Sequence, residues 1–373
     1  MQFEVNRSDF TEALRFCMTS VESRATIPIL SNALITGDPE ASTLTIETTD
    51  LEIASRATMP ATVMGSGSCA VPGRKLYDLS DRLSGDILKA RTTKQDHLGI
   101  ECASVKARLN ALSSDSFPEI PEPVGEGVTV PCVQLAAVIR GASYASAESE
   151  ARYVMKSVWL RKDARNLTAV CLDGHRMAHS SAEVSTAGEL DVKIFHRAAR
   201  ELTKILSNQQ PGSNCVVHSD ANMVWVVFSD RRFTFRHISE KYADGTKAVP
   251  RKFSGSTVVD LEEIMGMFKR AELFVGSDIK KGETQNPLWV EIKDGRLSLR
   301  MEGVDEGSFE ESMGVEIEGE PLEAIYKLRY LAEAIRYADT KAVRLLWADA
   351  LKPLKVESIQ GLVSNYGVVM PRR

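Results

Sequence analysis

Apolar residues recur at helical spacing in three stretches of the chain, and each stretch opens a longer segment rich in strand patterns. The stretches are RSDFTEALRFCMTSV from residue 7, PCVQLAAVIRGASYA from residue 131 and DLEEIMGMFKRAELF from residue 260. In the third stretch one helical face would carry four apolar residues, Ile264, Met267, Phe268 and Ala271. Ser8 and Asp260 are residue types that cap helix N-termini, so we expect the first and third helices to begin there.

An alternation of apolar and polar residues follows each predicted helix and indicates strands. In STLTIETTDLEIASRATM, from residue 42, we expect a turn near Thr49 and Asp50, with one face formed by Leu44, Ile46, Leu51 and Ile53. NLTAVCLDGHRMAHSS and GRLSLRMEGVDEGSFEES occupy the same place in the second and third segments. A second helix is then predicted in each segment, at PGRKLYDLSDRLSG from 72, FHRAARELTKILSN from 195 and YKLRYLAEAIRYAD from 326.

Each segment closes with strands that we expect to end at a proline, in FPEIP (117–121), KAVP (247–250) and VVMP (368–371). Pro121, Pro250 and Pro371 are 129 and 121 residues apart, so one pattern is repeated three times. The predicted fold class is α+β, with three tandem similar domains that each pack two helices on mostly antiparallel sheets. We expect domains at 1–125, 126–254 and 255–373. Stretches rich in proline, glycine and charge predict linkers near 118–129 and 249–257.

Composition narrows the class of protein. The 373 residues carry a net charge of −5, which argues against a surface that binds nucleic acid all round but allows one basic face. No run of 18 apolar residues occurs, and MQFEVNRSDF lacks the basic and apolar regions of a signal peptide. The six cysteines form no CxxC pair and suit buried free thiols. We therefore expect a cytoplasmic protein without a membrane span.

Asp173, Gly174, His175 and Arg176 form the cluster that most resembles a catalytic centre. Asp-Gly between alternating apolar runs is a strong hairpin signal, so we expect a turn at Asp173 and Gly174 and a return strand from His175. Neighbouring strand residues point to opposite faces, which disfavours joint action of His175 and Arg176 on one atom. An enzyme centred on Asp173, His175 and Arg176 remains a remote alternative.

Metal and phosphate motifs are absent from the sequence. His175 and His179 would lie about 13 Å apart along a strand, too far for one ion. GSGSCAVPGRK (65–75) contains neither phosphate-loop pattern, and GxSxG does not occur. We expect no metal, no cofactor and no catalytic residues.

Basic residues recur on the predicted helices of a chain that is acidic overall. The second helices carry Arg74, Lys75 and Arg82, then Arg197, Arg200 and Lys204, then Lys327, Arg329 and Arg336. The first helices add Arg15, Arg140, Lys269 and Arg270, and nearby loops add Arg24 and Arg152. Solvated helix faces often carry such residues, but their repetition in three related domains favours a shared surface for phosphates, without sequence specificity.

Several motifs together resemble the bacterial DNA polymerase III beta subunit family, the replicative sliding clamps. They are RATIPILSN (24–32) with TTDLE (48–52), DGHRMA (173–178) and the terminal VVMPRR (368–373), and the resemblance covers essentially the whole chain. It implies the DNA-clamp fold and a head-to-tail homodimeric ring that encircles duplex DNA. It also implies a non-catalytic processivity factor of DNA replication, associated with the nucleoid.

The resemblance further implies that a cleft between domains II and III binds short linear motifs. The partners would be the DNA polymerase III alpha subunit, the clamp loader, other polymerases and repair proteins. The cleft would be formed by Met155, Leu172, Gly174, His175, Arg176, Met177, Ala243, Lys247, Tyr330, Pro353, Val368, Val369, Met370, Pro371 and Arg372. DNA would face Arg24, Arg74, Lys75, Arg140, Arg152, Tyr153, Arg197, Arg200 and Lys204. The subunit contact would use Lys106, Leu109, Leu273 and Phe274.

Some positions depart from the family pattern. Ala243 stands where a proline usually lines the cleft, Lys247 where an arginine is usual, and Leu172 where threonine is common. Ala107 replaces an aromatic residue at the expected subunit contact, and the chain ends in MPRR. Replacing proline with alanine removes packing area and loosens a loop. A second or specialised clamp copy with altered partner selectivity is therefore the main alternative.

Overall fold

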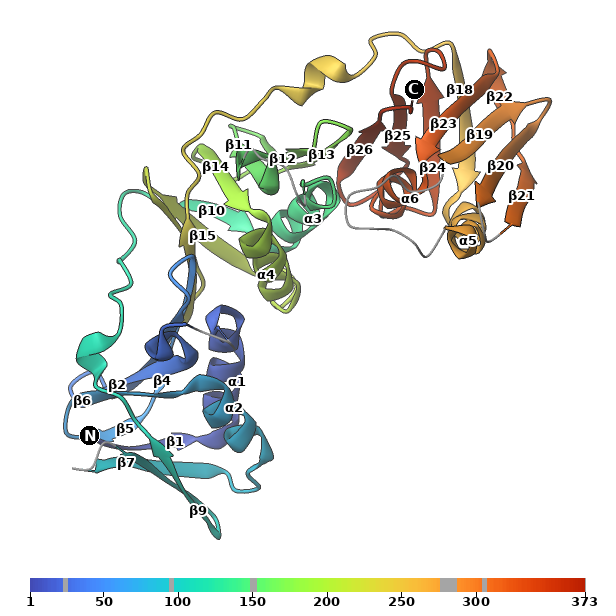
Figure 1. Cartoon of the computed structure of the whole chain (residues 1–373). Helices are drawn as coiled ribbons and strands as arrows, with labels where there is room; N and C mark the ends of the chain where they lie inside the picture. Colours follow the sequence, from blue (N-terminus) through green and yellow to red (C-terminus); the bar gives the residue numbers. More distant parts are fainter. Residues whose placement is uncertain (23–25, 94–96, 148–152, 276–286, 304–306, 373) are drawn as a thin grey trace. The chain divides into compact units, whose positions relative to one another are not determined.

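The computed structural model describes residues 1–373 except 23–25, 94–96, 148–152, 276–286, 304–306 and 373 (Figure 1). The chain divides into two compact units. Unit 1 contains Met1–Val130 and Ser213–His237, and unit 2 contains Pro131–Gly212 and Ile238–Arg373. Each unit contains segments from two of the three sequence repeats, while the domain boundaries expected from the repeats stay a prediction.

Unit 1 combines two sheets with the helices α1 (Arg7–Cys17) and α2 (Gly73–Arg82). The five-stranded sheet has the order β5 (Thr62–Met64), β1 (Gln2–Asn6), β7 (Ile87–Thr93), β8 (His97–Cys102) and β9 (Val105–Asn110). The eight-stranded sheet has the order β10 (Val128–Pro131), β15 (Asn214–Ser219), β16 (Met223–Val227), β17 (Arg231–Arg236), β4 (Ile53–Pro60), β3 (Thr43–Thr49), β2 (Asn32–Asp38) and β6 (Gly67–Pro72). Antiparallel pairing of β17 with β4 joins strands of the second repeat to strands of the first.

The described residues of unit 2 also form two sheets, with the α-helices α3 (Cys132–Ser143), α4 (His196–Ser207), α5 (Leu261–Ala271) and α6 (Leu328–Arg336). The nine-stranded sheet has the order β14 (Leu190–Phe195), β11 (Ser157–Lys162), β12 (Asn166–Leu172), β13 (Arg176–Glu183), β26 (Ser364–Val369), β25 (Leu354–Ser358), β24 (Ala342–Trp347), β18 (Gly255–Asp260) and β22 (Ile317–Gly319). The four-stranded sheet has the order β21 (Gly307–Gly314), β20 (Arg296–Gly303), β19 (Pro287–Lys293) and β23 (Leu322–Lys327). Antiparallel pairing of β13 with β26 joins the second repeat to the third.

All six predicted helices are present, with one correction to their caps. Asp260 caps α5 as expected, because its carboxylate accepts the N–H of Glu263 at 2.9 Å. The cap of α1 is Asn6, whose side-chain oxygen accepts the N–H groups of Ser8 and Asp9, so the expectation for Ser8 was wrong. Helix α1 begins at Arg7, directly after β1 ends at Asn6. The residue before the helix is therefore Asn6, and Ser8 already lies in the first helical turn.

Two expectations about strands also needed correction. Leu51 does not share the buried face of Leu44 and Ile53, because it lies in the turn with a φ of 75° and an exposed side chain. Only the third repeat ends with a strand that runs toward its proline, where β26 stops two residues before Pro371. The segment 117–121 is irregular, and Gly245–Ala248 forms a 3-10 helix.

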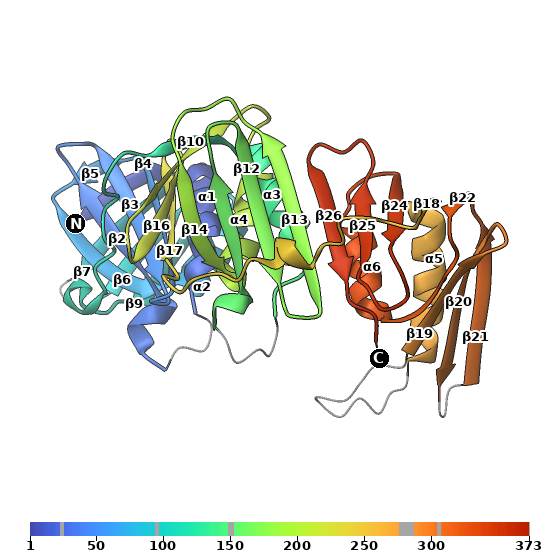
Figure 2. The ribbon, with the colours of Figure 1, turned by 90° about the horizontal axis from the view of Figure 1, so that it is seen from above.

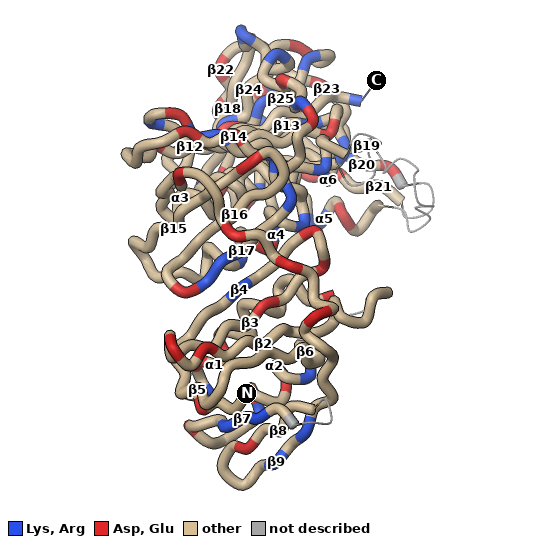
Figure 3. The backbone as a smooth tube through the Cα atoms, turned by 90° about the vertical axis from the view of Figure 1, so that its left-hand side faces the viewer, with Lys and Arg blue, Asp and Glu red and all other residues tan. Residues whose placement is uncertain are grey.

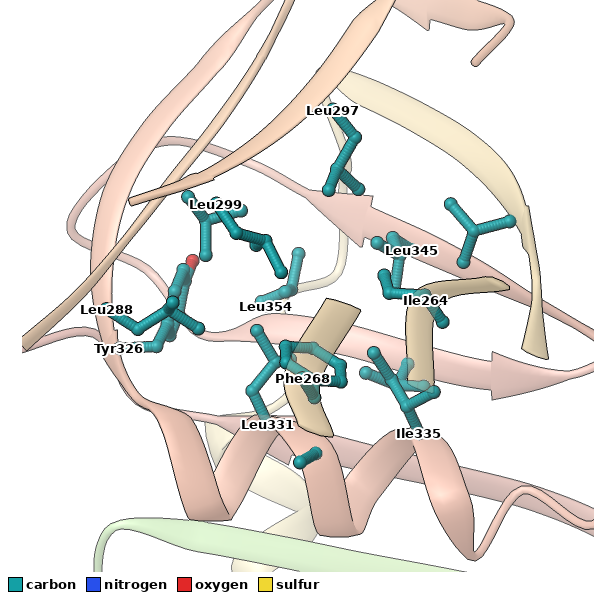
Figure 4. Close-up of a cluster of buried hydrophobic side chains, with 14 of the residues drawn as sticks. Ile264, Phe268, Leu288, Leu297, Leu299, Tyr326, Leu331, Ile335, Leu345 and Leu354 are labelled. Carbon is teal, nitrogen blue, oxygen red and sulfur yellow. The ribbon is translucent and has the colours of Figure 1, made fainter. Parts of the chain in front are cut away.

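The core of the third repeat shows why these elements assemble. Ile264 and Phe268 from α5 and Leu331 and Ile335 from α6 point into one apolar cluster (Figure 4). Side chains from both sheets complete this cluster, among them Leu288, Leu299, Tyr326, Leu345 and Leu354. The burial of one apolar face per helix and per strand matches the periodicities of 3.6 and 2 in the sequence.

The described residues contain no helix long and apolar enough to cross a membrane.

Candidate functional site

The Asp-Gly motif forms a hairpin between β12 and β13, as predicted (Figure 2). Gly174 has a φ of 84°, a conformation that glycine adopts without strain. The carboxylate of Asp173 accepts the N–H groups of His175 at 2.9 Å and Arg176 at 3.0 Å. His175 belongs to the turn, and β13 begins at Arg176, one residue later than expected. Asp173 therefore shapes the turn.

The C-terminal segment lies directly beside this hairpin. In the pairing of β13 with β26, Arg176 is opposite Val369 and Met177 is opposite Val368. The N–H of Met370 donates to the carbonyl oxygen of His175 at 2.9 Å. Two motifs that are almost 200 residues apart in the sequence thus form one continuous surface within unit 2.

An apolar cluster lies beneath the hairpin. Leu172, Met177 and Val368 are buried in it with Val154, Val170, Ile238 and Tyr242, and Met155 packs against it. The Tyr242 hydroxyl accepts the N–H of Leu172 and donates to the carbonyl oxygen of Ser157, both at 3.1 Å. Burial raises the pKa of Tyr242 far above its ordinary value. The hydroxyl therefore stays protonated and fixes the hairpin to the neighbouring strand.

Arg176 is a buried charge at the centre of this region. Its side chain is 3% exposed, and its Nε donates to Asp173 at 2.9 Å while its Nη1 donates to Glu333 on α6. The guanidinium lies 4.3 Å from the centre of the Tyr330 ring. Burial opposes the charge of Arg176, but the hydrogen bond to Glu333 and the nearby Asp173 raise its pKa above the ordinary value. Arg176 is thus held between the hairpin and α6.

The residues expected to form the cleft separate into three groups. Gly174, His175, Ala243, Lys247 and Met370 are exposed, with Met370 at 41%. Met155, Tyr330, Pro371 and Arg372 are half-buried. Leu172, Arg176, Met177, Pro353, Val368 and Val369 are buried. The first two groups offer contact area, whereas the third supports them from below.

The accessible residues around the hairpin combine apolar and polar chemistry. The His175 and Tyr330 rings lie 6.2 Å apart in a stacked arrangement, and Lys327 Nζ lies 4.8 Å from the centre of the Tyr330 ring. Met370 exposes a flexible thioether beside them, a side chain that adapts to different apolar partners. This combination suits a peptide with an apolar anchor and a polar or acidic neighbour.

Sequence reasoning missed Tyr242, Glu333 and Lys327. Tyr242 is buried under the hairpin, and nothing in KYADG indicates that its ring packs there. Arg329 and Glu333 are spaced as a helical ion pair, and their contact at 3.0 Å was open to prediction. The second partner of Glu333, Arg176, is 157 residues away in the sequence and leaves no local signal.

The residues expected to face DNA occupy varied environments. Arg24 and Arg152 lie outside the described residues. Arg74 and Lys75 are exposed on α2, and no described carboxylate pairs with them. Arg140 pairs with Asp339 at 2.6 Å, and Arg200 and Lys204 pair with Glu201 at 3.2 and 3.1 Å. Arg197 lies on α4, and the exposed Tyr153 stacks on Phe195 at 4.9 Å.

The residues expected at a subunit contact differ in accessibility. Leu273 is 76% exposed, and the neighbouring Phe274 packs near Phe309 with ring centres 5.5 Å apart. Lys106 is exposed and lies 3.6 Å from Glu101. Leu109 is 5% exposed and contributes to the interior of unit 1.

Titratable groups in the described residues show no clear metal or nucleophile site. No group of three or more histidine, cysteine, aspartate or glutamate residues in the described ranges is placed to hold a metal ion. The six cysteines are buried free thiols, and burial raises the pKa of Cys69 to about 11. A thiol with a raised pKa is a poor nucleophile.

Comparisons with known proteins agree with this architecture. Family models match three consecutive regions: the N-terminal domain of the DNA polymerase III beta subunit over residues 1–121, its central domain over 129–244 and its C-terminal domain over 246–373. Two curated relatives, both called beta sliding clamp, come from Synechocystis (27% identical) and Synechococcus elongatus (25% identical). Both alignments cover 100% of this chain and 99% of the relative. A crystal structure of the DNA polymerase III subunit beta from Pseudomonas aeruginosa matches with a TM-score of 0.90 at 23% identity, covering 100% of both chains.

Proposed function

The chain belongs to the DNA polymerase III beta subunit family, and from that premise we propose that it acts as a DNA sliding clamp. In this role two copies form a head-to-tail ring around duplex DNA and tether polymerases to it. The clamp is a processivity factor and docking platform, without catalytic activity of its own. The observation that carries the proposal is the joining of the hairpin to the C-terminal strand through β13, β26 and the Met370–His175 hydrogen bond.

The DNA side of the proposal needs weak contacts that let the ring slide. Arg74 and Lys75 are exposed, and Arg200 and Lys204 share one carboxylate, Glu201. The side chains of Arg200 and Lys204 are 63% and 61% exposed, whereas that of Glu201 is 13% exposed, so both cations reach solvent beside their shared carboxylate and can contact a phosphate. Such contacts ignore base sequence and weaken with salt.

The docking side of the proposal uses the exposed and half-buried groups of site residues. A short motif from the polymerase III alpha subunit, the clamp loader, another polymerase or a repair protein would place an apolar side chain against Met370 and Met155. His175 and Tyr330 would contact its polar part. Arg176 would support the hairpin without contacting the peptide, because its guanidinium already donates hydrogen bonds to Asp173 and Glu333.

The geometry of Asp173, His175 and Arg176 supports docking better than catalysis. The carboxylate of Asp173 accepts hydrogen bonds from the backbone N–H groups of His175 and Arg176 and from the Arg176 side chain. None of these bonds goes to the His175 ring. A general base needs an orienting partner or a substrate proton within reach.

One observation favours a specialised form of the same function. Ala243 is exposed beside the cluster, where the family usually has proline, and Leu172 is buried under the hairpin. A smaller, looser loop wall would change which peptides bind well. A more typical clamp encoded in the same genome would support this specialised role, and a single essential copy would contradict it.

Fluorescence anisotropy of a labelled Gln-Leu-x-Leu-Phe peptide tests the docking proposal. Removing the Met370 side chain takes away apolar contact area, so Met370→Ala should weaken binding by about 1–2 kcal/mol, or roughly 5- to 30-fold. Leu362→Ala is the matched control, because Leu362 is also an exposed apolar residue of unit 2, on the loop between β25 and β26. Equal binding by both variants, or no binding by the folded wild-type protein, would contradict the proposed site.

A further inference from the structure

The segment between β17 and β18 crosses the hairpin of the candidate docking site but is anchored there at few points. This strap, residues 238–250, runs past the ends of β12 and β13 (Figure 2). Ile238, at its start, is buried in the apolar cluster beneath the hairpin. In the stretch 239–248 every residue is exposed except Tyr242, which is buried, and Gly245, which is half-buried. These two residues therefore decide where the middle of the strap lies.

The charged residues of the strap contribute little to its attachment. All of them are exposed, namely Glu240, Lys241, Asp244 and Lys247. Asp244 and Lys247 pair with each other at 4.0 Å, and exposed pairs of this kind are weak. The strands β13 and β14 carry acidic as well as basic residues, so they offer the strap no single sign of charge (Figure 3). Packing contacts therefore set the height of the strap above the hairpin.

Gly245 rests directly on two side chains of the hairpin. Its backbone lies outside the left-handed region, so its conformation alone does not require glycine. The space around it does, because an added Cβ would lie 2.7 Å from Leu172 Cδ2 and 2.8 Å from Met177 Sδ. Atoms in good contact lie about 3.5–4.0 Å apart. Leu172 and Met177 are both buried in the packed cluster and have little room to move aside.

Tyr242 attaches the same part of the strap three residues earlier. Its hydroxyl accepts the N–H of Leu172 at 3.1 Å, and its ring stacks on Trp159 with the ring centres 5.5 Å apart. The strap thus holds Leu172 twice, by the backbone through Tyr242 and by the side chain through Gly245. Ala243 lies between these two fixed points and is exposed. The height of this part of the docking surface therefore follows from the two contacts.

We propose that Gly245 is a positioning residue of the docking site and sets the distance between the strap and the hairpin. This role rests on the proposed docking function, in which the exposed Ala243 and Lys247 belong to the peptide-binding surface. A side chain at position 245 would either lift the strap or push Leu172 and Met177 down into the cluster. Either movement changes the distance between the strap and the hairpin, so the contact of Gly245 with these two side chains fixes the width of the site.

A pair of compensating substitutions tests this role in the full chain. Gly245→Ala should weaken binding of the labelled Gln-Leu-x-Leu-Phe peptide about tenfold, because one added methyl group overpacks the contact. Leu172→Val shortens the opposing side chain by one carbon. Combined with Gly245→Ala it keeps the total volume, so the double variant should bind within about threefold of wild type. Gly266→Ala on α5 is the control, because the nearest atoms to a Cβ there belong to the flexible Arg270 guanidinium, at 3.3 Å and beyond.

The Trp159 ring reports the position of the strap without any peptide. Fluorine NMR of the chain labelled with 5-fluorotryptophan follows this ring, and Trp159→Phe assigns its resonance among the four tryptophans. Gly245→Ala should shift the resonance as Tyr242 moves against Trp159, and the double variant should return it toward the wild-type position.

The positioning role is wrong if Gly245→Ala and Gly266→Ala give the same Trp159 resonance and the same peptide affinity. It is also wrong if adding Leu172→Val reverses neither change. A folded wild-type chain that binds no peptide would contradict the docking function instead, and the Trp159 resonances would still decide whether Gly245 sets the position of the strap.

Discussion

Arg176 supports the candidate docking surface although its own side chain is buried. Its sequence context, next to His175 and Gly174, suggests a contact residue at the rim of a cleft. In the structure its guanidinium is buried and holds Asp173 of the turn and Glu333 of α6 together. We infer that Arg176 is a positioning residue for the hairpin and for the Tyr330 ring that lies against it.

Glu333→Gln should destabilise the protein by about 2–4 kcal/mol, because it leaves a buried cation with one carboxylate instead of two. Urea unfolding measures this change, and peptide affinity should fall with it as the hairpin loosens. Glu323→Gln is the control, since Glu323 is exposed on β23 and its substitution should change stability by less than about 0.5 kcal/mol. Indistinguishable unfolding curves for the two variants would refute the positioning role of the Arg176–Glu333 pair.

At the scale of elements, the linker expected near 118–129 is tied to the sheet of unit 1. Trp225 Nε1 donates to the carbonyl oxygen of Pro121 at 2.8 Å. Glu122 accepts hydrogen bonds from Arg56 on β4 and Arg232 on β17, which are directly opposed where these two strands pair. Like charges in such a pair repel, so Glu122 neutralises the point where strands of two repeats meet.

Glu122→Gln should weaken this strand pairing by on the order of 1 kcal/mol, a value discounted for the exposure of Glu122. The hydrogen bond from Arg232 holds the pKa of Glu122 below its ordinary value. Its contribution to stability is therefore present above the unfolded pKa near 4.5 and is lost as the pH falls. Hydrogen exchange of β4 and β17 reports the change, and Glu119→Gln in the same linker is the control. Exchange that is as slow in Glu122→Gln as in the control would rule out this role.

A second pairing between repeats predicts a pH effect of its own. His179 on β13 lies opposite Tyr366 on β26, and the two rings stack at 4.6 Å. Burial, together with Arg161 and Lys355, lowers the pKa of His179. The unfolded chain then binds a proton more readily than the folded chain, so stability falls as the pH drops through and below about 6.5.

Thermal unfolding between pH 7.5 and 5.5 measures this effect, and His179→Gln should flatten the slope. His218→Gln is the control, since His218 is a half-buried histidine on β15 in unit 1, whose Nδ1 lies 3.2 Å from the carbonyl oxygen of Gly125. An unchanged slope in His179→Gln would show that other groups cause the pH dependence.

The success of sequence reasoning at this scale depended on how local each signal is. The six helices and the hairpin were predictable because 3.6-residue periodicity and an Asp-Gly turn depend on a few neighbouring residues. The prediction of closing strands at 117–121 and 247–250 was wrong, because a proline also ends irregular segments and 3-10 helices and does not by itself indicate a strand. The pairings of Arg176 with Glu333 and of Arg232 with Glu122 were unpredictable, because each joins residues more than 100 positions apart in the sequence.

At the scale of the whole molecule, a sliding clamp requires two copies that close around DNA. Leu273 exposes a large apolar side chain beside Phe274, and Lys106 lies exposed on β9, the edge strand of its sheet. A free strand edge and an exposed leucine are features that a second copy would cover. Leu109, expected at the same contact, is buried in unit 1 and would support the edge from inside.

Retention on DNA of different topology tests the central claim most directly. The labelled chain is loaded onto a nicked circular plasmid with an ATP-driven clamp loader, the free protein is removed, and the plasmid is then linearised. A closed ring that holds phosphates only loosely should stay on the circle and leave the linear DNA through its ends, even at moderate salt. Equal retention on circular and linear DNA, or a chain that stays monomeric at micromolar concentration and cannot be loaded, would contradict the sliding-clamp account.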